Sequence, residues 1–145
     1  MDWWWPVVVL LAHVGPGEDD RWARVLTGLD LQRAVALRHD DPDALRDVYA
    51  SDAAAEDDLE LLGAYRKRGG QLEGALLLVE RAEVQRMTDD QVRLRIVDRL
   101  GPTRVRWEDG SSTRLPRDSS SERVVVLTLT DDGWRISEAR RPAPR

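Results

Sequence analysis

Hydrophobic residues recur at every third or fourth position in the first part of the chain, which is the spacing of an amphipathic helix. Between Asp20 and Arg38 this spacing predicts one helix with a buried apolar stripe. The stripe is made by Trp22, Val25, Leu26, Leu29, Leu31, Ala34 and Val35.

Start and stop signals predict two further helices. The Asp-Pro-Asp sequence at 41–43 offers a capping acceptor, a ring that fixes the first φ, and an acid favoured by the helix dipole. A short helix is therefore expected from there to about residue 50. A third helix can be capped by Ser51 or Asp52, and the Gly-Gly pair at 69–70 ends it.

Beyond residue 70 the hydrophobic period changes to two, which is typical of strands with one buried face. Turn residues that tolerate positive φ separate the alternating segments, and the polar stretch 111–121 is expected to be a loop. Strands are predicted at 72–87, 91–100, 122–130 and 134–140, with a weaker one around Val105 and Trp107.

Turn lengths predict the strand register. A three-residue turn at 88–90 sets these residues opposite each other: Glu83 and Arg95, Gln85 and Arg93, Val84 and Leu94, Ala82 and Ile96. A two-residue turn at 132–133 does the same for Leu129 and Ile136, and for Thr128 and Ser137. Both registers give an antiparallel sheet with one apolar face. Since that face needs a cover and three helices precede it, the predicted fold class is α+β.

The first of these registers also places two acids on the apolar face. Glu80 falls opposite Asp98, and two facing carboxyls in a core would repel each other, so one could keep its proton and act as a general acid or base. The alternative is that both are solvated or paired with Arg81 or Arg99, and a single strand bulge would separate them. Glu80 and Asp98 are therefore hypothetical catalytic residues.

Basic residues gather on the strands of the second half. Arg93, Arg95, Arg99, Arg104 and Arg106 form a stripe that could dock an anionic partner. The alternative is a solvated face balanced by acids such as Glu73 and Glu83.

The N-terminal segment is rich in tryptophan and apolar residues. Trp3, Trp4 and Trp5 precede an apolar run that is too short to span a bilayer, but indole rings favour the membrane interface. Residues 3–14 are thus expected to contact a membrane surface, unless they pack on the domain or a partner, or are the remnant of a spanning helix. We divide the chain into this segment with its linker (1–17), a domain (18–140) and a disordered tail (141–145).

Composition excludes several classes of function. The 145 residues are enough for one domain, and 22 basic against 27 acidic residues argue against nucleic-acid binding. No cysteine and only 2 histidines exclude disulfides, thiol catalysis and cysteine or multi-histidine metal centres. We accordingly expect no metal and no cofactor.

The segment between residues 34 and 53 resembles the nuclear transport factor 2-like superfamily, also called cystatin-like or SnoaL-like. In that family a short helix ends in an aromatic residue followed by Ala-x-Asp, and Tyr49, Ala50 and Asp52 match those positions. The resemblance implies three N-terminal helices packed on a curved, cone-like sheet, with Tyr49 and Tyr65 on helices that line its pocket. The family usually has a short strand pair after the aromatic residue, whereas residues 53–58 read as the start of a helix.

The family contains isomerases, dehydratases and cyclases as well as non-catalytic members. An apolar segment directly before such a domain is similar to the anchored, non-catalytic group. The resemblance therefore implies a binding or assembly module in a membrane-associated or extracytoplasmic setting, with a homodimeric or envelope protein partner. Its pocket is expected to hold a small apolar ligand or to be filled by side chains. The alternative is a small isomerase or cyclase that acts on an apolar carbonyl substrate, with Glu80 or Asp98 as base and Tyr49 or Tyr65 as hydrogen-bond donor.

Overall fold

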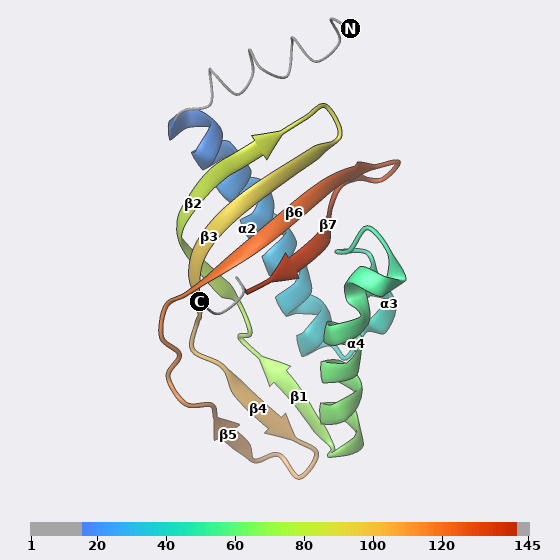
Figure 1. Cartoon of the computed structure of the whole chain (residues 1–145). Helices are drawn as coiled ribbons and strands as arrows, with labels where there is room; N and C mark the ends of the chain where they lie inside the picture. Colours follow the sequence, from blue (N-terminus) through green and yellow to red (C-terminus); the bar gives the residue numbers. More distant parts are fainter. Residues whose placement is uncertain (1–15, 142–145) are drawn as a thin grey trace, which may run out of the picture.

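The computed structural model describes residues 16–141, in which three helices precede the strands, as the α+β prediction requires (Figure 1). The helices are α2 (Pro16–Arg38), α3 (Pro42–Arg46) and α4 (Asp52–Lys67). The strands are β1 (Gly70–Glu73), β2 (Leu77–Met87), β3 (Gln91–Leu100), β4 (Arg104–Trp107), β5 (Ser112–Arg114), β6 (Ser121–Thr130) and β7 (Gly133–Arg140).

Helix α2 begins earlier than its hydrophobic pattern indicates. Pro16 and Gly17 form its first turn instead of the predicted linker, because the first turn does not need the N–H that proline lacks. The predicted contacts of Trp3, Trp4 and Trp5 lie outside the described residues and stay predictions. None of the helices within 16–141 is both long and apolar enough to cross a bilayer.

The two predicted capping sites are confirmed. The side chain of Asp41 accepts a hydrogen bond from the Ala44 amide at 3.0 Å and begins α3. The Ser51 hydroxyl accepts from the Ala54 amide at 3.1 Å and begins α4. Because α4 starts at Asp52, a helix follows the aromatic residue directly, as the sequence predicts.

Helix α3 is shorter than predicted, because the residues after it pair with the sheet. Tyr49 forms a parallel bridge with Ile136 of β7. The Ala50 amide donates to the Ile136 carbonyl at 2.8 Å, and the Ile136 amide donates to the Val48 carbonyl at 3.1 Å. Tyr49 thus lies in a turn against β7 and not on a helix.

The strands form two sheets, ordered β2-β3-β6-β7 and β1-β4-β5. The single strand predicted at 72–87 is divided at Gly74, whose φ of 78° breaks the extended chain. A Cβ at this position would lie 2.6 Å from the Pro102 carbonyl oxygen, so glycine also allows the two backbones to approach. The predicted loop 111–121 contains the short strand β5.

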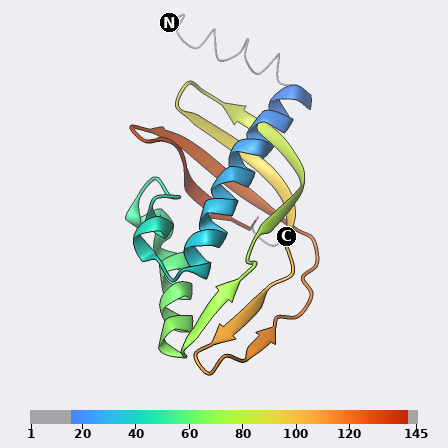
Figure 2. The same ribbon diagram turned by 180° about the vertical axis from the view of Figure 1, so that it is seen from behind.

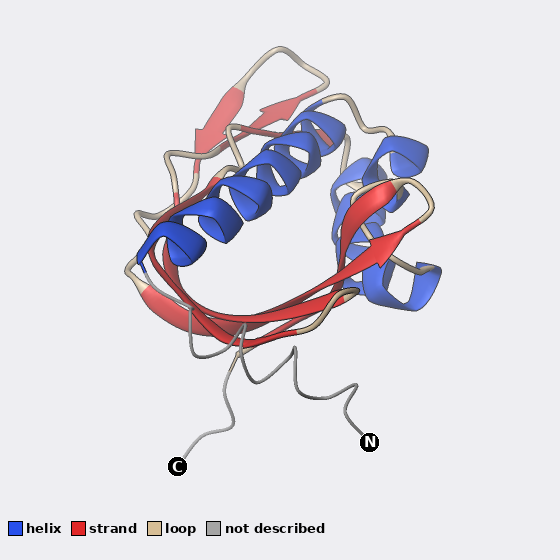
Figure 3. Ribbon diagram, turned by 90° about the horizontal axis from the view of Figure 1, so that it is seen from above, coloured by secondary structure: helices blue, strands red, loops and turns tan. Residues whose placement is uncertain are grey.

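The four-stranded sheet curves around α2, which lies in its concave face (Figures 2 and 3). Side chains from α2 and from the inner faces of the strands fill the space between them, with Trp22 and Trp134 packed edge to face at 4.7 Å. A second core cluster, at the junction of α2, α3 and α4 with β1 and β4, includes Leu37, Leu45, Leu62, Leu72 and Val105.

The predicted register of β2 and β3 is correct through the middle of the hairpin. Glu83 faces Arg95 and Val84 faces Leu94, but an irregularity after Val84 sets Arg93 opposite Arg86 instead of Gln85. The β6–β7 register differs from the prediction by two residues, since Ile136 faces Leu127. Next to the turn, a shift of two residues keeps the side chains on their predicted faces. An irregularity between Val126 and Leu127 sets Val126 opposite Glu138, so beyond it the register differs from the prediction by one residue.

The arginines predicted as one basic stripe are divided between the two sheets. On the four-stranded sheet, Arg95 forms an ion pair with Glu122, and Arg93 donates to the Gln85 side chain. On the other sheet, Arg104 and Arg106 lie 3.1 and 3.7 Å from Glu73, so part of the stripe is balanced by acids. Trp107 is half-buried at the edge of the second cluster.

The outer edge of β2 is covered at one point by α2. Asp19 accepts a hydrogen bond from the Val84 amide at 2.9 Å through its side-chain oxygen Oδ1. Since β2 is the first strand of the four-stranded sheet, this bond satisfies an amide that faces away from β3.

Candidate functional site

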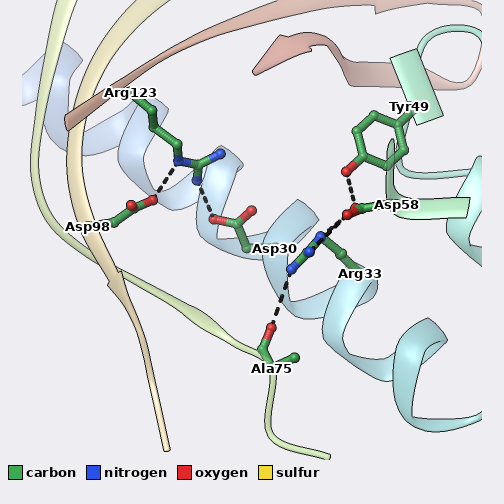
Figure 4. A network of polar contacts seen from close by, with 7 residues as sticks. All are labelled: Asp30, Arg33, Tyr49, Asp58, Ala75, Asp98 and Arg123. Carbon is green, nitrogen blue, oxygen red and sulfur yellow. Dashed lines mark hydrogen bonds and ion pairs between the residues drawn. The ribbon is translucent and has the colours of Figure 1, made fainter. Parts of the chain in front are cut away.

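Charged side chains lie inside the cone, where the inner face of the sheet meets α2 (Figure 4). Arg123 of β6 donates from Nε to Asp98 of β3 at 2.6 Å and from Nη2 to Asp30 of α2 at 3.4 Å. The side chains of Asp30, Asp98 and Arg123 are only 1%, 4% and 14% exposed. They form a buried ion-pair triad that joins the helix to two strands.

A second group of polar contacts ties α2 to α4. Arg33 binds Asp58 with two hydrogen bonds, at 2.5 and 2.9 Å, and also donates to the Ala75 carbonyl at 3.5 Å. The Tyr49 hydroxyl donates to the same carboxylate of Asp58. Both oxygens of Asp58 are therefore occupied.

Asp30 of α2 and Asp58 of α4 have pKa values that are shifted in opposite directions. Burial raises the pKa of Asp30 to about 6, although the nearby charges of Arg123 and Arg33 act to lower it. Burial also acts to raise the pKa of Asp58, but the hydrogen bonds and charge of Arg33 outweigh it, so this pKa lies below its ordinary value. The pKa of Tyr49 is raised by burial and by the adjacent carboxylate of Asp58, which keeps its hydroxyl protonated.

Asp30 has an unused hydrogen-bonding atom. Its Oδ2 faces Arg123, while Oδ1 points away from it and has no hydrogen-bond partner (Figure 4). Oδ1 is the one buried side-chain nitrogen or oxygen within residues 16–141 that lacks a partner. Since buried polar atoms are nearly always paired, this acceptor distinguishes the site from an ordinary core.

A cavity of about 280 Å³ adjoins both groups of contacts. Five aspartates and four arginines line it, among them Asp30, Arg33, Asp58, Asp98 and Arg123. The cavity is also lined by less polar residues, namely Tyr49, Leu77 and Ile136. The cavity thus has a mixed-charge wall, and Asp30, whose Oδ1 is buried and unpaired, is one of its residues.

The predicted pairing of Glu80 with Asp98 is wrong. A bulge in β2 sets Val79 opposite Asp98 and Arg81 opposite Val97, so Glu80 has no partner residue on β3. Glu80 is exposed and accepts a hydrogen bond from Ser120. Asp98 is buried and accepts a hydrogen bond from Arg123. Asp98 alone of the two lines the cavity.

The two tyrosines predicted to line the pocket lie in different places. Tyr49 lines the cavity from the turn before α4. Tyr65 lies on α4, as predicted, but packs half-buried against the second core cluster, with the Arg68 guanidinium 5.8 Å from its ring. Tyr65 is not among the residues that line the cavity.

The sequence analysis did not identify four residues of the site: Asp30, Arg33, Asp58 and Arg123. Two of them could have been found from the sequence, because each is a charged residue at a position where the hydrophobic pattern predicts a buried side chain. Asp30 follows Leu26 by four residues on the stripe of α2, and Arg123 alternates with Val125 and Leu127 on the inner face of β6. A charge at a predicted core position is a better indicator of a site than two acids in an assumed register.

Comparisons with known proteins identify the fold. No protein-family model and no curated protein matches the sequence. Solved structures do match: the intermembrane space region of the chloroplast protein ARC6 has a TM-score of 0.62 at 8% identity, covering 87% of this chain and 97% of that one. A protein of Streptomyces avermitilis, assigned as a dehydratase of the NTF2-like family, has a TM-score of 0.51 at 11% identity, covering 83% and 95%.

The chain has a nuclear transport factor 2-like fold. A protein of Novosphingobium aromaticivorans assigned as an aromatic ring hydroxylase agrees, with a TM-score of 0.54 at 16% identity over 90% of this chain and 94% of that one. The solved structures that resemble this chain thus have quite different assignments, and at these identities the likeness concerns the fold alone. The function has to be argued from the site.

Proposed function

We propose that this chain is a non-catalytic binding module that takes a small hydrogen-bond-donating ligand in the cavity beside Asp30. The observation that carries the proposal is the Oδ1 atom of Asp30, a buried acceptor without a partner. Leaving such an atom unpaired costs about 1–3 kcal/mol. A ligand N–H or O–H placed against it would remove that cost.

The charges of the cavity wall favour a polar ligand over the apolar one expected from the sequence. Five aspartates face four arginines there. Both arginines beside Asp30 already bind carboxylates, Arg123 in the triad and Arg33 on Asp58. An amine or an alcohol therefore suits the site better than an anion.

The same contacts support binding rather than catalysis. An enzyme that abstracts a proton next to a carbonyl needs a free donor for the oxyanion that develops. The Tyr49 hydroxyl, the donor expected for that role, already donates its hydrogen bond to Asp58. Its raised pKa also makes the hydroxyl a weaker donor of protons.

Three probes of the same shape test the proposal: benzylamine, benzyl alcohol and toluene, titrated into the ¹⁵N-labelled protein and followed by NMR. We expect benzylammonium and benzyl alcohol to shift amide resonances around the cavity, such as those of Leu77 and Ile136, and toluene to shift none. In Asp30→Asn, benzylammonium should bind about tenfold more weakly or worse, since a charge-assisted hydrogen bond contributes about 1.5–3 kcal/mol.

Asp57→Asn is the matched control, because Asp57 also lines the cavity but is exposed. This variant removes the same charge without removing a buried acceptor. It should weaken the binding of benzylammonium by less than about threefold. Equal binding of toluene, or equal losses in the two variants, would contradict the proposal.

One observation favours the enzyme as a second candidate. With a pKa of about 6, Asp30 is ionised near neutral pH and still basic enough to accept a proton. In that case the protein should accelerate hydrogen–deuterium exchange at the α-carbon of cyclohexanone in D₂O by about 10²-fold or more. The rate should rise with pH through about 6 and be lost in Asp30→Asn. Exchange at the buffer rate would exclude this candidate.

A further inference from the structure

A second, larger groove of about 890 Å³ lies along the three-stranded sheet. Residues 100–103, from the end of β3 to the start of β4, line the groove, and we call them its floor. Residues 114–118, from the end of β5 onward, also line it, and we call them one wall. The three-stranded sheet is at the opposite end of the domain from the start of α2 (Figure 1). The groove shares Asp118 with the cavity beside Asp30 and is otherwise lined by different residues.

The groove is basic, although the protein carries a net charge of −5. Two acidic residues line the groove, and both already have hydrogen-bond or ion-pair partners. Glu73 accepts from Arg104 at 3.1 Å and also lies 3.9 Å from Arg38, and Asp118 accepts from the Leu100 amide at 2.7 Å. Five arginines line the groove: Arg38, Arg99, Arg104, Arg114 and Arg117.

Three of these arginines lack an acidic partner in the part of the chain that the structure describes. Within residues 16–141, no carboxylate lies within ion-pair distance of Arg99, Arg114 or Arg117. Arg114 and Arg117 are exposed, and Arg99 is half-buried. Leu115 lies half-buried between the two exposed arginines, so apolar surface alternates with positive charge along this wall.

We propose that this groove binds an acidic, extended segment of a partner protein. The complementary charge is negative, and the arginines lie on separate elements. Those of α2 and β4 pair with Glu73, whereas those at the end of β3 and in the segment 114–117 are unpaired within residues 16–141. Carboxylates spaced along an extended chain can meet such separated cations, whereas one compact anion can meet only those on one wall. Half-buried Leu115 suits an apolar side chain between the acids.

The test uses a fluorescein-labelled peptide of about twelve residues in which glutamate alternates with serine or valine, a length of about 40 Å when extended. Fluorescence polarisation should show saturable binding that weakens as salt is added, because exposed charges are screened. A peptide with glutamine in place of every glutamate should not bind. Amide resonances of Gly101 and Thr103 in the groove floor should shift with the acidic peptide only.

The decisive variant is the double charge reversal Arg114→Glu and Arg117→Glu. Both side chains are exposed and unpaired within residues 16–141, so the fold should be retained, and peptide affinity should fall about tenfold or more. The control is Arg24→Glu with Arg86→Glu, two exposed arginines outside the groove that give the same net charge. This control should lose less than about twofold in its affinity for the peptide.

Several outcomes would overturn the proposal. They are equal binding of the glutamine peptide, equal losses in the two double variants, or no binding of either peptide. Groove-dependent binding of inorganic phosphate or of phosphatidylglycerol vesicles, without the peptide, would also overturn it and assign the groove to a small anion or a lipid headgroup. None of these results bears on Asp30, because the groove arginines do not line its cavity.

Discussion

Replacing Arg123 with alanine is expected to lower the free energy of unfolding by about 3–5 kcal/mol. Arg123 is the ion-pair partner of both Asp30 and Asp98, whose side chains are 1% and 4% exposed. Without the guanidinium, two buried carboxylates that repel each other would be left with no cation of the triad between them. Urea denaturation at pH 7, followed by circular dichroism, measures the loss.

The control for this variant is Arg95→Ala, on the outer face of the same sheet. Arg95 also pairs with a carboxylate, Glu122, but its side chain is 48% exposed. Its loss should cost less than about 1 kcal/mol. A triple variant that makes the triad apolar, Asp30→Leu with Asp98→Leu and Arg123→Met, should recover much of the stability, since no buried charge then lacks a partner. If Arg123→Ala is no more destabilising than Arg95→Ala, the triad is not the buried unit described above.

The second large effect is on pH dependence, and its sign follows from Asp30. The pKa of this carboxyl is about 6 in the folded protein, against 3.8 as its ordinary value. The folded state therefore holds the proton more tightly than the unfolded state, and stability falls as pH rises from about 4 to about 6. A shift of this size corresponds to about 3 kcal/mol at most. The charged groups around Asp30 are Arg123, Arg33, Asp98 and Asp58.

Urea denaturation at intervals between pH 3 and pH 7 measures this dependence, with Asp30→Asn as the comparison. The variant has no proton to release, so its stability should change less with pH between 4 and 6. Asp58 acts in the opposite direction and at lower pH: its pKa is depressed, so its contribution is lost on acidification below about pH 4. Curves for the two proteins that run parallel from pH 4 to 6 would contradict the assignment to Asp30.

The elements that the sequence predicts well are those fixed by local chemistry. Asp41 and Ser51 cap their helices as expected because the acceptor and its amide lie three residues apart. Val84 and Leu94 face each other as predicted, although Arg86 faces Arg93 nearer the turn, because the irregularity between Val84 and Arg86 restores the register that matches the apolar faces. Between bulges, the inner and outer faces of the long strands follow from the alternation of side chains, as for Val92, Leu94 and Ile96 of β3.

The candidate site could not be predicted in the same way, because its contacts join distant segments. Asp30 and Arg123 are 93 residues apart in the chain. The bulge at Glu80 has no signature in the sequence, and it alone separates the two acids that the register places together. The break at Gly74 is marked by a glycine, but one glycine in an alternating pattern predicts a bulge as readily as the end of a strand.

The turn after α3 and the carboxylate of Asp19 have a shared consequence for how this molecule can associate. Residues 48–50 bond to β7, and Asp19 bonds to β2, so each outermost strand of the large sheet is occupied at one point by the chain itself. Unsatisfied backbone groups on terminal strands are where proteins recruit further strands and polymerise. Addition of a further strand to the large sheet is therefore opposed at Val84 of β2 and at Ile136 of β7, where these backbone groups already have partners.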